Sequence, residues 1–237
     1  MCAAADFERY RARFQGDPEG NGGRWEIRHR LQAIGDQAKA AFASEAIPLD
    51  RRESLHHPHH TNRKRVLRQR TMLFRDKRSR QALQRFLGKE LGKDLDSAMN
   101  NVHFQLGLDL AGAYWGMRID AGAWYDLNVL LKRAEEQEGQ EALRTAVSAT
   151  PGFQLEVDGG GARPLAPMSC RDWRDLAGLL RPGESSLEVV KRTPAAAVAA
   201  AGEDFGDAVV ADLLRLAPLY RLACWSLDGG SPSGASL

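Results

Sequence analysis

The chain has 237 residues, of which 43% are apolar and 27% are charged. This composition excludes an intrinsically disordered protein, and three cysteines are too few for a disulfide scaffold. A chain of this length buries about 70% of its unfolded surface, so it needs neither a metal nor a disulfide to fold.

Cysteine usage and apolar runs bear on the compartment. Cys2, Cys170 and Cys224 lie far apart and form no CxxC pair, which favours a reducing cytoplasm. The N-terminus lacks the basic and apolar regions of a signal peptide. The longest apolar run, around 195–201, is far shorter than the roughly 20 residues of a bilayer span. We therefore expect a cytoplasmic protein with no membrane partner.

The first part of the chain is predicted to be helical. Apolar residues recur three or four positions apart in residues 6–42, and we expect a break near the glycines of 16–23. Pro48 and Asp50 then favour a turn. A strand is predicted over 65–75.

A helix is predicted over 79–91, with Leu83, Phe86 and Leu87 on its inward side. The strongest signal follows at 103–119. Two segments of alternating apolar and polar residues flank a short turn at 111–112, which predicts an antiparallel hairpin. Its inward residues would be Phe104, Leu106, Leu108, Trp115, Met117 and Ile119.

The remaining elements alternate between helix and strand. Asp120 is expected to cap a helix that follows the hairpin. Strands are predicted over 153–157 and 186–192, and helices over 170–180 and 207–222, with Pro218 bending or ending the last. The mixture of helices with an antiparallel pair predicts the α+β class. Residues 228–237, rich in Gly and Ser, are expected to form a disordered tail.

Three segments resemble the bacterial YktB-like family, whose function is unknown. They are the strand pair that contains HFQLGL (103–108) and Tyr114-Trp115, the segment RDKR (75–78) and the segment LRLAPLYR (214–221). The resemblance implies one domain over 1–227, with a curved, mainly antiparallel sheet and helices packed on one face, similar to the fold of the TATA-binding protein. Residues 81–102 depart from the family pattern and would form a helical insertion. The resemblance implies no catalytic residue.

Positive charge is concentrated in residues 51–80. This segment holds 11 basic and 2 acidic residues, whereas the rest of the chain holds 22 basic and 29 acidic residues. Such a patch attracts polyanions, of which nucleic acid is the commonest. The alternative is that the arginines pair with acids of the same chain. The predicted contacts to nucleic acid are Arg63, Lys64, Arg65, Arg68, Arg70, Arg75, Lys77, Arg78 and Arg80.

A second hypothesis is an enzyme or a small-molecule-binding protein. The polar side of the predicted hairpin would line a ligand groove with His103, Gln105, Asp109, Tyr114 and Arg118. His103 and Asp109 would lie roughly 20 Å apart along one strand, so they could not act on one atom together. A third hypothesis is a protein–protein adaptor with exposed rings at Trp124, Tyr125 or Trp225.

The histidines at 56, 57, 59 and 60 raise the question of a metal. Pro58 is expected to hold this run extended, so that alternate imidazoles point apart. No CxxC or HExxH motif accompanies them. We therefore predict no metal and no cofactor, and the sequence leaves open whether the protein is an enzyme.

Overall fold

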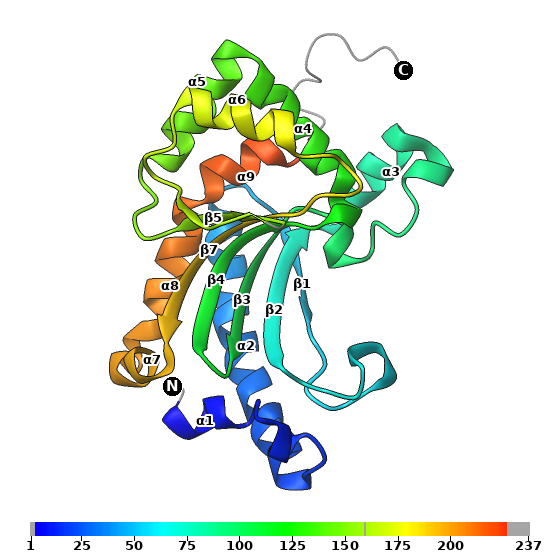
Figure 1. The fold of residues 1–237 in the computed structure, drawn as a ribbon. Coiled ribbons are helices and arrows are strands. Elements are labelled where there is room, and N and C mark those ends of the chain that lie inside the picture. Colours follow the sequence, from blue (N-terminus) through cyan, green and yellow to red (C-terminus); the bar gives the residue numbers. More distant parts are fainter. Residues whose placement is uncertain (1–2, 159, 227–237) are drawn as a thin grey trace.

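The computed structural model describes residues 3–158 and 160–226. Its centre is an open seven-stranded sheet, curved in Figure 1, in which all pairings are antiparallel and the order is β1-β2-β3-β4-β7-β5-β6. The prediction of an α+β fold with an antiparallel sheet is confirmed. The strands are β1 (Leu49–Glu53), β2 (Arg68–Arg75), β3 (His103–Asp109), β4 (Gly112–Ile119), β5 (Gln154–Val157), β6 (Arg163–Pro164) and β7 (Leu187–Pro194).

The helices account for most of the remaining chain. None of them, over the described ranges, is long and apolar enough to cross a bilayer. The α-helices are α1 (Ala4–Glu8), α2 (Pro18–Ser44), α3 (Lys77–Leu91), α4 (Trp124–Glu135), α5 (Gln137–Val147), α6 (Cys170–Leu179), α7 (Ala195–Ala201), α8 (Asp204–Arg215) and α9 (Ala217–Ala223). Short 3-10 turns are η1 (Ala12–Phe14), η2 (His60–Asn62), η3 (Ala98–Asn100) and η4 (Ala121–Ala123).

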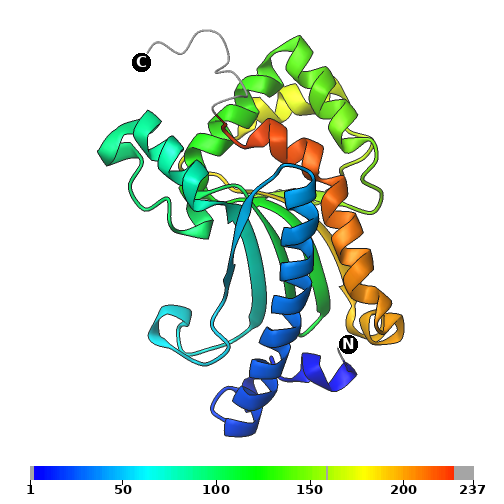
Figure 2. The ribbon, with the colours of Figure 1, turned by 180° about the vertical axis from the view of Figure 1, so that it is seen from behind.

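Two long helices cover one face of the sheet. Figure 2 shows α2 crossing this face with α8 beside it, while α4, α5, α6 and α9 gather at one end of the strands. Three stacked rings connect α2, the sheet and α9. Phe42 of α2 lies 4.2 Å from Phe104 of β3, and Phe104 lies 4.8 Å from Tyr220 of α9, between ring centroids. The opposite face of the sheet is toward the viewer in Figure 1. Because side chains alternate along a strand, the polar residues of the hairpin lie on the face opposite the buried Phe104.

The break predicted near the glycines of 16–23 is misplaced. Helix α2 begins at Pro18, and the Asp17 side chain accepts hydrogen bonds from the backbone N–H groups of Glu19 and Gly20. The later glycines lie inside the helix. A Cβ at Gly20 would lie 2.6 Å from the Phe14 carbonyl oxygen. Glycine therefore allows the preceding segment to pack against α2, and it does not end the helix.

The hairpin over 103–119 is confirmed, with Leu106 opposite Trp115 across β3 and β4. Its apolar side chains enter the core as predicted. The polar side is more buried than alternation alone predicts. His103 and Gln105, on that side, are each 2% exposed or less.

Strand β1 was missed, since Pro48 and Asp50 favoured a turn. Two of its residues facing α2 are charged rather than apolar. Arg51 pairs with Asp36 at 2.9 Å, and Glu53 pairs with Arg28 at 3.5 Å. Because these positions are charged, the segment lacks the alternation of apolar and polar residues by which a strand is predicted from sequence.

Helix α3 begins two residues earlier than predicted and runs into the segment 81–102. Leu83 is buried and Leu87 is half-buried, as expected, but Phe86 is 48% exposed. The prediction for residues 228–237 lies outside the described residues.

Candidate nucleic-acid interface

The nine basic residues predicted to contact nucleic acid occupy three different environments. Two of them are internal. Arg75 is buried and pairs with Asp126 at 2.6 Å, and Arg80 pairs with Asp50 at 2.7 Å and with Asp96 at 3.1 Å. Their guanidinium groups are committed to carboxylates of the same chain. Including Arg75 and Arg80 in a nucleic-acid surface was therefore wrong.

The other seven separate into two groups at opposite ends of β2. Lys77 and Arg78 are exposed in the first turn of α3, beyond Arg75. Seven residue steps from Arg68 to Arg75 place the two ends of the strand roughly 24 Å apart. The larger group lies at the Arg68 end and consists of Arg63, Lys64, Arg65, Arg68 and Arg70.

Part of this larger group lines a hollow of about 400 Å³ between β2 and the loop that joins β1 to β2. We call it the basic hollow. Arg65, Arg68 and Arg70 line it, and no described acidic residue does. The remaining lining residues are Ser54, Leu55, Thr61, Asn62, Val66 and Leu67. The charge is therefore of one sign, with hydroxyl and amide groups beside it.

The loop is fixed by side-chain hydrogen bonds, from within the loop and from Gln15. Asn62 donates a hydrogen bond to the His57 carbonyl oxygen at 2.9 Å and accepts one from the His59 N–H at 2.8 Å. Gln15 binds the backbone of Val66 through both its amide oxygen and its amide nitrogen. The basic side chains therefore project from a loop whose backbone is fixed by these hydrogen bonds.

Arg63 and Lys64 follow η2 with positive φ angles of 56° and 57°. This left-handed region costs a non-glycine residue about 1–2 kcal/mol. Backbone strain of this kind concentrates at functional sites. Both side chains are exposed next to the hollow.

Arg70 has an environment that sets it apart from the other arginines of the hollow. It is half-buried, and its guanidinium group donates only to Gln105 Oε1 at 3.0 Å and to Met99 Sδ at 3.7 Å. Among the described residues, no carboxylate lies within ion-pair distance of it. Burial lowers the pKa of Arg70; Tyr114 and Asp120 act against this shift, while Arg68 and Arg118 add to it. A partly desolvated cation without a counter-ion is costly.

Tyr114 adds an unused donor close by. A Cβ at Gly107 would overlap the Tyr114 ring, so the ring lies across Gly107, and Gly107 is paired with Arg70 on β2. The Tyr114 hydroxyl is buried and has no hydrogen-bond partner among the described residues. Burial raises the pKa of this hydroxyl, so it keeps its proton.

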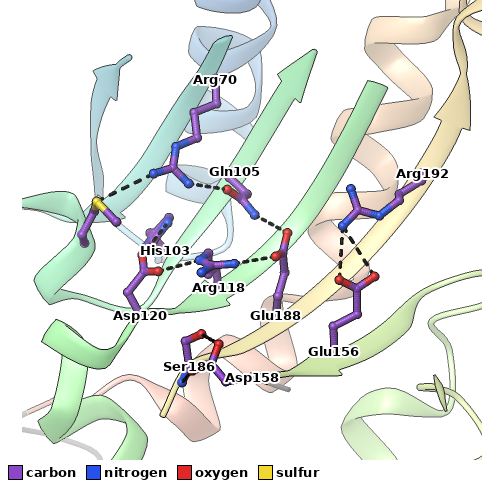
Figure 3. A network of polar contacts seen from close by, with 11 residues as sticks. Arg70, His103, Gln105, Arg118, Asp120, Glu156, Asp158, Ser186, Glu188 and Arg192 are labelled. Carbon is purple, nitrogen blue, oxygen red and sulfur yellow. Dashed lines mark hydrogen bonds and ion pairs between the residues drawn. The ribbon is translucent and has the colours of Figure 1, made fainter. Parts of the chain in front are cut away.

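The rest of the predicted ligand groove is occupied by its own side chains, as Figure 3 shows. Gln105 donates to Glu188 at 2.7 Å. Arg118 donates to Glu188 at 2.5 Å and to Asp120 at 2.6 Å. Asp120 therefore binds Arg118 and gives no side-chain cap to η4, contrary to the sequence prediction.

His103 and Asp109 lie at opposite ends of β3, as their spacing predicts. His103 is fully buried, with Nδ1 3.0 Å from the Asn101 carbonyl oxygen. Asp109 accepts hydrogen bonds from the N–H groups of Ala111 and Gly112 in the hairpin turn. The structure does not bring the two side chains together.

The rings proposed as adaptor anchors are not prominent on the surface. Trp225 is 8% exposed, and Trp124 and Tyr125 are half-buried. Within the described parts of the chain, no group of three or more His, Cys, Asp or Glu residues is arranged to hold a metal ion.

A comparison with protein-family models finds no match, and no curated protein is significantly similar to the chain. The YktB-like resemblance therefore stays a prediction.

Proposed function

We propose that this protein binds nucleic acid through the basic hollow, with its arginines in contact with backbone phosphates. The observation that carries the proposal is the lining of the basic hollow, which contains three arginines and no described carboxylate. A phosphate oxygen bound there would supply the missing negative charge, and a guanidinium group binds phosphate with two parallel hydrogen bonds. Arg65 and Arg68 line the same hollow.

Two further features support a phosphate ligand. Ser54 and Thr61 place hydroxyl groups in the lining, and such groups accompany arginine in phosphate contacts. Arg63 and Lys64 extend the positive surface beyond the hollow, which suits a ligand with several phosphates along a chain.

The alternative, an enzyme or small-molecule site on the polar side of the hairpin, has less support. Its charged groups Arg118, Asp120 and Glu188 neutralise one another, and His103 is fully buried. The basic hollow, in contrast, carries charge that the described residues leave unpaired.

The test is a binding titration with fluorescein-labelled 20-nucleotide RNA and DNA at several salt concentrations. The variant Arg65→Gln/Arg68→Gln replaces two exposed cations, so it tests the hollow without disturbing the core. We expect weaker binding to every sequence. The slope of log affinity against log salt should fall by about 0.7–0.9 for each phosphate that the variant no longer neutralises.

The matched control is Lys77→Gln/Arg78→Gln, which removes the same charge at the other end of β2. It should leave the affinity nearly unchanged. Equal losses of affinity in the two variants, or no retention of RNA or DNA at low salt, would overturn the proposal. Equally tight binding of a mononucleotide would show that the ligand is a small phosphate compound and would also overturn it.

A further inference from the structure

A series of aromatic rings lies along the loop that forms the basic hollow. Adjacent ring centroids are 3.9–6.1 Å apart. The expectation that Pro58 keeps alternate imidazoles apart is wrong, because the ring centroids of His57 and His59 lie 6.1 Å apart. We call the series the ring ladder; it comprises Trp25 and His29 of α2 and His56, His57, His59 and His60 of the loop.

Two arginines of α2 assemble the ladder from segments about 30 residues apart in the chain. Arg24 is fully buried and donates to the His56 carbonyl oxygen at 2.8 Å. Arg28 donates to the Ser54 carbonyl oxygen at 2.9 Å. These bonds hold the start of the loop against α2, and they place His56 4.8 Å from Trp25 between ring centroids.

The ladder and the basic hollow share residues of the same loop. Asn62 lines the hollow and binds the backbone of His57 and His59. Thr61 also lines the hollow, and its hydroxyl lies 3.0 Å from Nδ1 of His59. The same short stretch of loop, 57–62, therefore contributes to both features.

The ladder presents ring surface to solvent. Trp25 is 44% exposed, and His29 and His60 are exposed. Indole and imidazole rings are surfaces on which unpaired bases stack, and proteins that bind single strands combine such rings with a positively charged groove.

We propose that the ring ladder is a base-stacking surface and that the nucleic acid bound by this protein is single-stranded. The proposal rests on the function proposed above and adds to it the class of nucleic acid. The phosphates lie in the basic hollow, and the bases lie on Trp25 and the histidine rings. Duplex bases are already stacked on each other, so a duplex offers phosphates to the hollow but no free base face to the ladder.

The experiment compares three labelled probes with 20 nucleotides per strand: a single strand, an abasic single strand with the same number of phosphates, and a duplex. Each is titrated with the full chain and with the variants Trp25→Leu and Trp25→Phe. The matched control is Phe86→Leu, which removes a ring of similar exposure on α3, far from the loop. Circular dichroism checks that each variant is folded.

We expect the single strand to bind more tightly than the abasic strand and the duplex. Trp25→Leu should weaken binding of the base-bearing single strand by about fivefold or more, which is the loss of affinity expected when one base no longer stacks on a ring. It should leave binding of the abasic strand unchanged. Trp25→Phe, which retains a ring, should recover most of the affinity, and Phe86→Leu should have no effect.

Equal affinity for the base-bearing and abasic strands would overturn the ladder as a stacking surface. An equal effect of Trp25→Leu on both strands would do the same. In either case, loss of binding in Arg65→Gln/Arg68→Gln would leave the proposed function standing. If none of the three probes binds, the proposed function fails together with this inference.

Discussion

At the scale of single residues, burial decides the charge of His103. Its Nε2 atom has no hydrogen-bond partner among the described residues and lies 4.0 Å from Oδ2 of Asp120. Burial lowers the pKa of His103 to about 4, although the Asn101 carbonyl and Asp120 act in the opposite direction. The imidazole is therefore neutral at pH 7, and its Nδ1–H donates to Asn101.

This environment predicts a dependence of stability on pH. In the unfolded chain a histidine binds a proton near pH 6.5. The folded protein does not protonate His103 until about pH 4. The unfolded state binds more protons between these values, so the free energy of unfolding should fall as the pH falls, by up to about 1.4 kcal/mol per pH unit.

Urea denaturation at pH 7.5, 6.0 and 5.0 measures this effect. His103→Gln has no titrating group at this position, so its stability should decline less over the same range. Carboxylates titrate in both proteins, and the difference between the two curves isolates His103. Parallel curves would contradict the prediction.

At the scale of elements, sequence patterns identified those whose buried residues are apolar. The alternation over 103–119 predicted β3 and β4 because one side of each strand faces the core. Strand β1 was missed because Arg51 and Glu53 face α2 through ion pairs. The start of α2 was misplaced because Gly20 serves close packing against Phe14, and a sequence does not distinguish that use from helix breaking.

The glycines of α2 give a prediction at this scale. Gly22 is exposed, and an added Cβ would meet nothing within 4 Å. Gly22→Ala should raise the free energy of unfolding by about 0.5–1 kcal/mol, because alanine loses less conformational freedom in a helix. Gly20→Ala, which would crowd the Phe14 carbonyl, should lower it. Urea denaturation measures both, and the same sign for both would contradict this account.

At the scale of the whole molecule, Arg75 and Asp126 join distant parts of the chain. Arg75 of β2 also donates to Asn101 at 2.8 Å and to the Trp225 carbonyl oxygen at 3.3 Å. Asp126 of α4 accepts from the N–H of Val102 at 2.8 Å. Burial alone would lower the pKa of Arg75, but Asp126 raises it above its ordinary value. The pair links the sheet to the helical end.

Breaking this pair should destabilise the fold. Arg75→Met leaves the Asp126 carboxylate buried without its cation, which costs about 3–5 kcal/mol. The double variant Arg75→Met/Asp126→Leu removes both charges and should recover part of the loss. Thermal or urea unfolding measures the two free energies. A single variant as stable as the parent, or a double variant less stable than the single, would contradict the prediction.

The candidate site was partly predictable from the sequence. The density of basic residues in 51–80 indicated the segment. The density of charge could not show that Arg75 pairs with Asp126, 51 residues further along the chain, and is therefore buried. Nor could it bring Trp25 to the histidines of the loop, because that contact depends on α2 packing beside β1. The local sequence shows where charged and aromatic residues are concentrated, whereas ion pairs and ring contacts between distant segments depend on the tertiary fold.

The placement of the basic hollow and the ring ladder has a consequence for how such a protein can diversify. Much of both lies in one connection between β1 and β2, whose ends are held by strand pairing. Doubling the length of a flexible loop adds only about 0.6 kcal/mol of closure cost. Insertions and exchanges there would change the hollow and the ladder while the sheet and its helices stay intact.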